Sequence, residues 1–255
     1  MDWEAFFRLH ADLPREGPGD AATARRAIAA TGLSGPLTVL DLGSGPGAGS
    51  LTLLQRLPEA QVTAIDTHAP FLAQAEARVA AAGHAARFRT LCTDMASPPV
   101  PPGSVDLIWC EGAIYFLGIA AGLARWRPLL APVGRVVFSE PVWLTETPSP
   151  ACAAMWQAEY PPMSDEAGIR AAVARAGYRV IEAFPLGAAA WAAYYEPLAA
   201  REAALRSWHG DDAALAEARR EIAVWERYGA EYDYLMVICA PHLPEPPEPP
   251  DPRAP

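Results

Sequence analysis

The residues best suited to bind a charged ligand are a glycine-rich segment and three aspartates, each placed where an apolar run ends. The segment is Gly43-Ser44-Gly45-Pro46-Gly47, and Asp41 lies two residues before it. Asp66 and Asp94 follow the next two apolar runs. Glycines at alternate positions allow a tight turn that brings the backbone close to a ligand, and a helix beginning there offers unpaired N–H groups. Several nucleotide cofactors bind to such a turn, so the turn alone identifies none of them.

The position of Asp41 distinguishes between these cofactors. A carboxylate so close to the turn would repel the pyrophosphate of a dinucleotide. It suits S-adenosylmethionine, which carries an ammonium and a sulfonium. The two oxygens of Asp66 can accept from both hydroxyls of a ribose, and Asp94 can accept from an adenine amino group, with the backbone of Met95 close to the ring edge. The acids therefore predict a site for S-adenosylmethionine.

The elements that would position these residues alternate between short apolar strands and helices. Strands are expected at 37–41, 61–66, 87–91, 105–110 and 134–139. Helices are expected between the first three strands, at 50–55 and from Phe71 to Gly83. Strands separated by helices in this way specify an α/β fold with a parallel sheet and helices on both faces. The three aspartates should then share the carboxyl edge of that sheet, where such folds bind ligands.

The second half of the chain contains longer excursions between its strands. Ser164 is the expected N-cap of a helix that Gly177 ends, and a sixth strand follows at 178–184. Helices at about 190–208 and 212–228 precede a last strand at 234–240. The expected organisation is one domain at 1–240, with an N-terminal cap at about 1–19, a helical lid at about 188–230, and a disordered proline-rich tail at 241–255.

In their order along the chain, these features resemble the class I S-adenosylmethionine-dependent methyltransferases. The resemblance rests on Asp41-Leu42-Gly43-Ser44-Gly45-Pro46-Gly47, Asp66, Asp94 and the apolar run 105–110. It covers roughly residues 20–185, and 234–240 matches the antiparallel last strand of the family. A closer resemblance, to uncharacterised bacterial small-molecule methyltransferases, runs through Leu9 to Gly19 and Trp109 to Leu117.

The family resemblance implies a fold, a reaction and a set of cofactor-binding residues. The fold is a Rossmann-like seven-stranded sheet in the order 3-2-1-4-5-7-6, with the last strand antiparallel. The reaction is transfer of the methyl group of S-adenosylmethionine to a nitrogen, oxygen or sulfur atom of a small-molecule acceptor, which leaves S-adenosylhomocysteine. Together with the arguments from the residues above, the resemblance assigns to the cofactor Asp41, Gly43, Ser44, Gly45, Gly47, Asp66, Thr67, Asp94, Met95 and Glu111. Arg15 is either a partner for the carboxylate of the cofactor or an exposed loop arginine.

Two glutamates and a tyrosine are candidates to act on the acceptor. Glu111 follows the fourth strand and Glu140 follows the fifth, so both are expected beside the transferred methyl group, with Tyr115 close by. A base is required only if the nucleophile arrives protonated. His10 and His209 could approach this edge, although isolated histidines are more often structural. Two acids in an acidic protein favour an amine or another cation as acceptor, while hydroxyl and thiol acceptors stay open.

Aromatic residues in the excursions could cover the acceptor, and they serve either to pack the lid or to bind the substrate. The substrate-binding candidates are Tyr115, Trp143, Tyr160, Tyr194 and Tyr195. Enzymes of this fold that methylate planar amides or ring nitrogens often carry Asn-Pro-Pro-Tyr after the fourth strand. Here the segment reads Cys110-Glu111-Gly112-Ala113, which argues against DNA bases and glutamine as acceptors.

The composition of the chain excludes several other functions. A formal net charge of −10 over 255 residues argues against nucleic acid as a partner. All 20 basic side chains are arginines, and the absence of lysine excludes Schiff-base and P-loop chemistry. Four scattered cysteines predict reduced core thiols rather than disulfides or a metal site.

The same composition bears on location and assembly. The N-terminus lacks the features of a signal peptide, and no apolar run reaches the roughly 18 residues that span a bilayer. We therefore expect a cytoplasmic protein with no membrane partner, either a monomer or a homodimer.

Two other functions stay open at this point. A nicotinamide-dependent oxidoreductase uses a similar turn, and Gly43, Gly45 and Ala48 fit its pattern. Asp41 and the absence of a Tyr-x-x-x-Lys pair argue against this function. A non-catalytic ligand-binding or regulatory protein could also retain the fold. Such a protein is expected to lose the glycine turn or the aspartates, and this chain has both.

Overall fold

Strands and helices alternate through most of the chain, of which the computed structural model describes residues 3–242. The strands are β1 (Thr38–Leu42), β2 (Gln61–Asp66), β3 (Phe88–Cys92), β4 (Val105–Cys110), β5 (Leu130–Trp143), β6 (Ser164–Asp165), β7 (Tyr178–Pro185) and β8 (Tyr232–Pro241). The α-helices are α1 (Trp3–His10), α2 (Ala21–Thr31), α3 (Ala48–Arg56), α4 (Ala69–Ala81), α5 (Ile119–Trp126), α6 (Pro150–Glu159), α7 (Glu166–Arg175), α8 (Ala188–His209) and α9 (Ala213–Tyr228). The short 3-10 helices are η1 (Ala85–Arg87), η2 (Ile114–Phe116) and η3 (Arg127–Leu129).

The sheet has the predicted strand order. Seven strands follow one another as β3-β2-β1-β4-β5-β8-β7, and the two-residue β6 pairs with β5. Without β6 this is the predicted order 3-2-1-4-5-7-6. The strands from β3 to β5 are parallel, and β8 runs antiparallel to both β5 and β7. The carboxyl ends of β1, β2, β3 and β4 therefore share one edge of the sheet.

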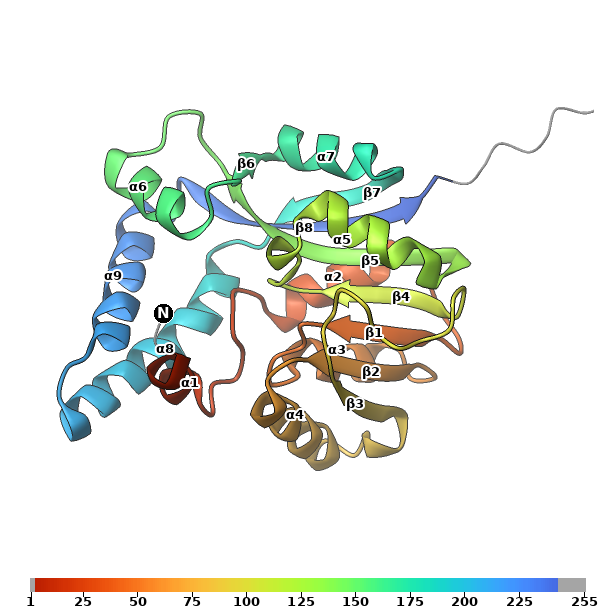
Figure 1. Ribbon diagram of the computed structural model, residues 1–255, viewed down its shortest axis with the longest axis horizontal. Coiled ribbons are helices and arrows are strands. Elements are labelled where there is room, and N and C mark those ends of the chain that lie inside the picture. Colours follow the sequence, from red (N-terminus) through yellow and green to blue (C-terminus); the bar gives the residue numbers. More distant parts are fainter. Residues whose placement is uncertain (1–2, 243–255) are drawn as a thin grey trace, which may run out of the picture.

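Alternate residues of the central strands belong to two hydrophobic cores, one on each face of the sheet. Val39 and Leu107 pack in one core with residues of α2 and α3. Leu40 and Ile108 pack in the other core with residues of α5 and α7. Figure 1 shows these two pairs of helices on opposite faces. Because both faces are covered, the central strands β1 and β4 are mainly apolar, as expected for a parallel sheet, and their charged residues are Asp41 and Asp106.

A helical excursion extends from one side of the sheet (Figure 1). Its helices α8 and α9 lie between β7 and β8 in sequence and pack against each other, where a lid was expected. The N-terminal helix α1 contacts both of them. Arg8 of α1 forms an ion pair with Asp212, the N-cap of α9. No helix in residues 3–242 combines the length and apolar composition that crossing a bilayer requires.

The turn after β1 requires backbone conformations that favour glycine. Gly43, Gly45 and Gly47 have φ values of 67°, 50° and 81°. A Cβ atom at Gly43 would lie 2.5 Å from the Cβ of Ala113, and one at Gly47 would lie 2.6 Å from the Cβ of Ala75 in α4. Larger side chains would therefore push the turn away from its neighbours. The glycines hold the N-terminus of α3 close to the sheet edge.

Two predicted boundaries are wrong. The fifth strand continues past Ser139 to Trp143, because β8 pairs with it in register through this stretch. Glu140 therefore lies inside β5 rather than after it. Asp165, not Ser164, is the N-cap of α7, and its Oδ1 accepts from the N–H of Gly168 at 2.8 Å.

Two further predictions need correction. Cys92, at the end of β3, is exposed and is not a core thiol, whereas the other three cysteines are buried. Pro241 belongs to β8, and the N–H of His242 donates to the carbonyl of Gly177 at 2.9 Å, so these residues are not part of a disordered tail. The remainder of the predicted tail, 243–255, lies outside the described residues.

The close packing of the turn gives a testable consequence. Gly47 and Gly83 have nearly equal φ values of 81° and 80°, but a Cβ at Gly83 would meet no atom within 4 Å. Gly83→Ala should therefore lose only about 1 kcal/mol of unfolding free energy, the cost of the backbone conformation. Gly47→Ala should lose roughly a further 1–3 kcal/mol, because the methyl group overlaps Ala75. Urea unfolding of both variants measures the difference, and equal losses would contradict the packing.

Candidate active site

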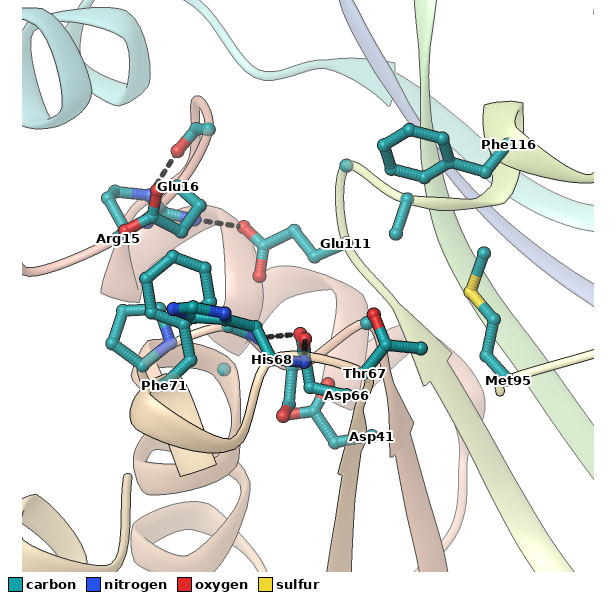
Figure 2. A pocket seen from close by; sticks show the side chains of 18 of the residues that line it. Arg15, Glu16, Asp41, Asp66, Thr67, His68, Phe71, Met95, Glu111 and Phe116 are labelled. Carbon is teal, nitrogen blue, oxygen red and sulfur yellow. Dashed lines mark hydrogen bonds and ion pairs between the residues drawn. The ribbon is translucent and has the colours of Figure 1, made fainter. Parts of the chain in front are cut away.

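A cavity of about 510 Å³ lies at the carboxyl edge of the sheet, between the strand ends and the N-terminal segment (Figure 2). Its volume is in the range of small-molecule sites. Of the residues predicted to bind the cofactor, those that line the cavity are Arg15, Asp41, Gly43, Ser44, Gly45, Asp66, Thr67, Asp94, Met95 and Glu111. Gly47 does not line it and packs against α4 instead.

Asp41 forms a buried part of the cavity wall and is 2% exposed. Its Oδ2 accepts from the hydroxyl of Ser50, in α3, at 2.6 Å. Burial, with a smaller contribution from the charges of Glu111 and Asp66, raises the pKa of Asp41 to about 7, and the hydrogen bonds of Ser50 oppose this rise. A carboxylate in these surroundings is stabilised when a cation comes close.

Asp66 connects the glycine turn to the loop after β2. Its Oδ2 accepts from the N–H of Gly45 at 2.9 Å, and its Oδ1 accepts from the N–H of His68 at 2.8 Å (Figure 2). Each carboxylate oxygen has two lone pairs, so both oxygens can still accept from a ligand hydroxyl. Asp66 therefore shapes the turn and remains able to bind a ribose.

Asp94 and Met95 line the same cavity beyond β3. Asp94 is exposed, and its Oδ1 accepts from the N–H of Ala96 at 2.7 Å. The carbonyl of Met95 accepts from the indole N–H of Trp126 at 2.8 Å. One lone pair of this carbonyl is therefore used by Trp126, and contact with an adenine ring would also use the N–H and the side chain of Met95.

Arg15 and Glu111, which were assigned separately to the cofactor, bind each other across the cavity (Figure 2). Nη2 of Arg15 lies 2.7 Å from Oε1 of Glu111, and both side chains are largely buried. The indole N–H of Trp109 donates to Oε2 of Glu111 at 3.3 Å. A Cβ at Gly19 would lie 1.9 Å from Oε1 of Glu111, so the N-terminal segment passes directly over this pair.

Several residues that line the cavity were not predicted. They are Phe6, Phe7, Glu16, His68, Phe71, Thr93 and Phe116. The rings of Phe7 and His68 stack with 3.6 Å between their centroids. The signal that could have indicated them is the aromatic pair Phe6-Phe7 within the expected cap, and the position of His68 two residues after Asp66.

The predicted acceptor residues Tyr115, Tyr160 and Glu140 lie together. Tyr115 lines the cavity, and its ring centroid is 5.7 Å from that of Tyr160. The hydroxyl of Tyr160 donates to Oε1 of Glu140 at 2.5 Å. Glu140 is 2% exposed and does not line the cavity. Burial raises its pKa to about 7, and the Tyr160 hydrogen bond opposes this rise.

The other aromatic candidates do not line this cavity. Trp143 is half-buried against the core, and Tyr194 and Tyr195 are buried. The hydroxyl of Tyr195 donates to Oε1 of Glu221, in α9, at 2.7 Å. The structure therefore places these three residues in the packing of the sheet and the helical excursion.

The two candidate histidines lie on different helices, α1 and α8. His10 is buried at the end of α1, and its Nδ1 lies 2.5 Å from Oε2 of Glu16, which lines the cavity. His209 is the last residue of α8.

The charges around the cavity are predominantly negative. Among the described residues that line it, five are acids, namely Glu16, Asp41, Asp66, Asp94 and Glu111, and one is an arginine. Because Arg15 is already paired with Glu111, a bound cation would be favoured and a diphosphate would not.

Comparison with known proteins agrees with this architecture. A family described as a methyltransferase domain matches residues 39–134. A malonyl-[acyl-carrier protein] O-methyltransferase of Laribacter hongkongensis is 33% identical over 110 residues, which are 41% of this chain and 37% of that protein. A trans-aconitate 2-methyltransferase of Methylobacterium nodulans is 32% identical over 146 residues, 57% of this chain and 52% of that protein. The chain thus matches about half or less of the length of these relatives.

The fold is shared over nearly the whole chain with solved structures. A SAM-dependent methyltransferase from Geobacter sulfurreducens, crystallised with S-adenosyl-L-homocysteine, has a TM-score of 0.80 and 23% identity, and the match covers 94% of this chain and 98% of that one. Residues 39–134 therefore match a methyltransferase domain, and the chain shares the fold of this methyltransferase over nearly its whole length.

Proposed function

We propose that this chain transfers the methyl group of S-adenosylmethionine to a small-molecule acceptor. The observation that carries the proposal is the buried carboxylate of Asp41 beside the glycine turn, in a cavity lined by five acids and one arginine. These surroundings stabilise a sulfonium and an ammonium, and they repel the pyrophosphate of a dinucleotide.

The residues present fit this cofactor. The hydroxyl of Ser44 is buried in the turn and has no hydrogen-bond partner in the described part of the chain, so it is available to a ligand. We assign the methionine portion to Asp41, Gly43 and Arg15. Asp66 would bind the ribose, and Asp94 with Met95 would bind the adenine.

Methyl transfer requires mainly positioning and the exclusion of water. The bound cofactor supplies an electrophilic methyl group, and the protein must hold the acceptor in line with it. Residues 1–19 and 188–230 act as cap and lid in this proposal. It is supported by Phe6 and Phe7, which line the cavity, and by the Arg8–Asp212 ion pair between α1 and α9.

The proposal names one cofactor but admits several kinds of acceptor. The relatives are named for malonyl-[acyl-carrier protein] and trans-aconitate, so oxygen nucleophiles are included with nitrogen and sulfur nucleophiles.

Calorimetry with S-adenosylmethionine and with NADH tests the cofactor part of the proposal. We expect uptake of the first and none of the second; tight binding of NADH alone would refute it.

Removal of the Asp66 carboxylate should weaken cofactor binding. Asp66→Ala should lower the affinity for S-adenosylhomocysteine by roughly 1–3 kcal/mol, the scale for hydrogen bonds to a charged group. Asp165→Ala is the matched control, because Asp165 also accepts from a backbone N–H, that of Gly168, but caps α7 away from the cavity. Calorimetry gives both affinities, and an unchanged affinity of Asp66→Ala would refute the ribose assignment.

The raised pKa of Asp41 predicts that cofactor affinity depends on pH. A sulfonium favours the ionised carboxylate, so binding below pH about 7 requires Asp41 to lose a proton. Affinity for S-adenosylmethionine should therefore rise about tenfold from pH 6 to pH 8 and then level off. Asp41→Asn should retain only the titration of the cofactor itself. Titrations of both proteins across this range measure the effect, and parallel curves would contradict it.

A further inference from the structure

One carboxylate oxygen behind the cavity wall is buried without a partner. In Glu140, Oε1 accepts from the hydroxyl of Tyr160, whereas Oε2 has no hydrogen-bond partner among the described residues. Glu140 is 2% exposed. Buried polar atoms in proteins are nearly always hydrogen-bonded, and an unpartnered carboxylate oxygen is costly. This oxygen is therefore the kind of group that a bound donor would satisfy.

Tyrosines connect Glu140 to the cavity. Tyr115 lines the cavity, and its ring is 5.7 Å from Tyr160. Tyr234 of β8 is buried and precedes Leu235, the residue that pairs with Glu140 across the two strands. Burial raises the pKa of its phenol, and the charges of Tyr115, Glu140 and Glu221 act in the same direction. We call Tyr115, Tyr160, Tyr234 and Glu140 the tyrosine–glutamate cluster. It adjoins the cavity at Tyr115, on the side where η2 follows β4.

The surroundings of this cluster are acidic. The charged side chains that act on the phenol of Tyr115 are Glu221, Glu140 and Glu159, and all of them raise its pKa beyond the effect of burial. Glu16 lines the cavity as well, and its Oε1 is a second buried carboxylate oxygen without a partner in residues 3–242. An anionic acceptor would meet these carboxylates, whereas a cation would neutralise one of them.

Aromatic faces near the cavity add a second attraction for a cation. The rings of Tyr115 and Phe116 lie 4.3 Å apart, and Phe116 is 68% exposed while it lines the cavity. Cations bind over aromatic faces, and the exposed ring of Phe116 offers contact to an apolar group. An acceptor with a positive head and an apolar arm would fit both features.

We infer that the methyl acceptor is an amine, which the tyrosine–glutamate cluster binds as an ammonium through Oε2 of Glu140. This inference rests on the proposed methyl transfer and names its substrate class. Glu140 has two roles in it: its carboxylate pairs with the incoming ammonium and then takes up a proton from it.

Proton transfer to Glu140 precedes methyl transfer. The ammonium R–NH3⁺ gives one proton to the carboxylate of Glu140 and becomes R–NH2. The nitrogen lone pair forms the N–CH3 bond while the S–CH3 bond breaks, and its electron pair stays on the sulfur, which becomes neutral. The products are R–NH2⁺–CH3, S-adenosylhomocysteine and protonated Glu140. The charge before and after the step is the same.

The test compares acceptors that share a phenethyl group and differ in the polar group attached to it. Phenethylamine, 3-phenylpropanoate and 2-phenylethanol are offered to the full chain with S-adenosylmethionine, and formation of S-adenosylhomocysteine is measured. Binding of the same three compounds to the protein loaded with S-adenosylhomocysteine is measured by calorimetry, as a readout that needs no turnover. We expect the amine to bind and react at least tenfold better than the acid.

Variants of Glu140 test the assignment to the cluster. Glu140→Gln should lower kcat/KM for the amine about 100-fold, which is the lower end of the range for loss of a general base. Its affinity for S-adenosylhomocysteine should stay within about twofold of the wild-type value. Glu226→Gln, an exposed glutamate of α9, is the matched control and should behave as the wild type. The wild-type rate should fall below pH about 7, where Glu140 becomes protonated, and this fall should be absent in Glu140→Gln.

Tyr160→Phe provides a second variant that keeps the carboxylate, in case Glu140→Gln fails to fold. It removes the hydrogen bond that lowers the pKa of Glu140, so the fall in rate should begin at a higher pH. The inference is overturned if the acid binds or reacts as well as the amine, if no amine binds to the loaded protein, or if neither variant changes the pH profile. Failure to bind S-adenosylmethionine at all would instead overturn the proposed function.

Discussion

The burial of one ionisable group, Asp41, constrains everything around the edge of the sheet. Its carboxylate has a single hydroxyl donor from α3, so α3 must begin close to the end of β1. A Cβ at Gly49, in the first turn of that helix, would lie 3.4 Å from Oδ2 of Asp41 and 3.1 Å from the indole nitrogen of Trp109, which explains a glycine there. The glycine turn, the start of α3 and the indole of β4 thus enclose one carboxylate. Burial of this carboxylate costs free energy, and a bound cation offsets that cost. The arrangement therefore favours positively charged ligands over neutral or negative ones.

The remaining walls of the cavity come from segments distant in sequence. The N-terminal segment supplies Arg15 and Glu16, β4 leads to Glu111 and Tyr115, and β5 carries Glu140 behind them. Acids and hydrogen-bonding aromatic residues gather toward the helical excursion, whereas the glycine turn and Asp66 lie toward β1 and β2. The proposed positions of the cofactor and the acceptor follow this arrangement. The parallel half of the sheet would bind the cofactor, and the acceptor would enter where the antiparallel strand β8 and the excursion meet the cavity.

Much of the fold could be predicted from periodicity, because strands covered on both faces are mainly apolar, as in Val105–Cys110, where Asp106 is the one charged residue. The acids after those runs could be assigned to one edge for the same reason, and Asp41, Asp66 and Asp94 do line one cavity. The length of β5 could not be predicted, since it depends on pairing with β8 about a hundred residues later. Nor could the Arg15–Glu111 pair or the stacking of Phe7 on His68, because each joins residues whose proximity arises only from tertiary packing. Local patterns indicate which residues reach an edge, but they do not show which of them become partners there.

The first helix has a consequence for how binding and folding are coupled. It contacts α8 and α9, its Arg8 is paired with Asp212, and the segment that follows it carries one partner of the Arg15–Glu111 pair. Any coupling between docking of this terminus and occupancy of the cavity is reciprocal, so each would favour the other by the same factor. Detaching the terminus would open the cavity and remove the contacts of α1 with the helical excursion in a single event. Residence time in the cavity would then be governed by the undocking rate of about twenty residues rather than by the contacts of the ligand alone.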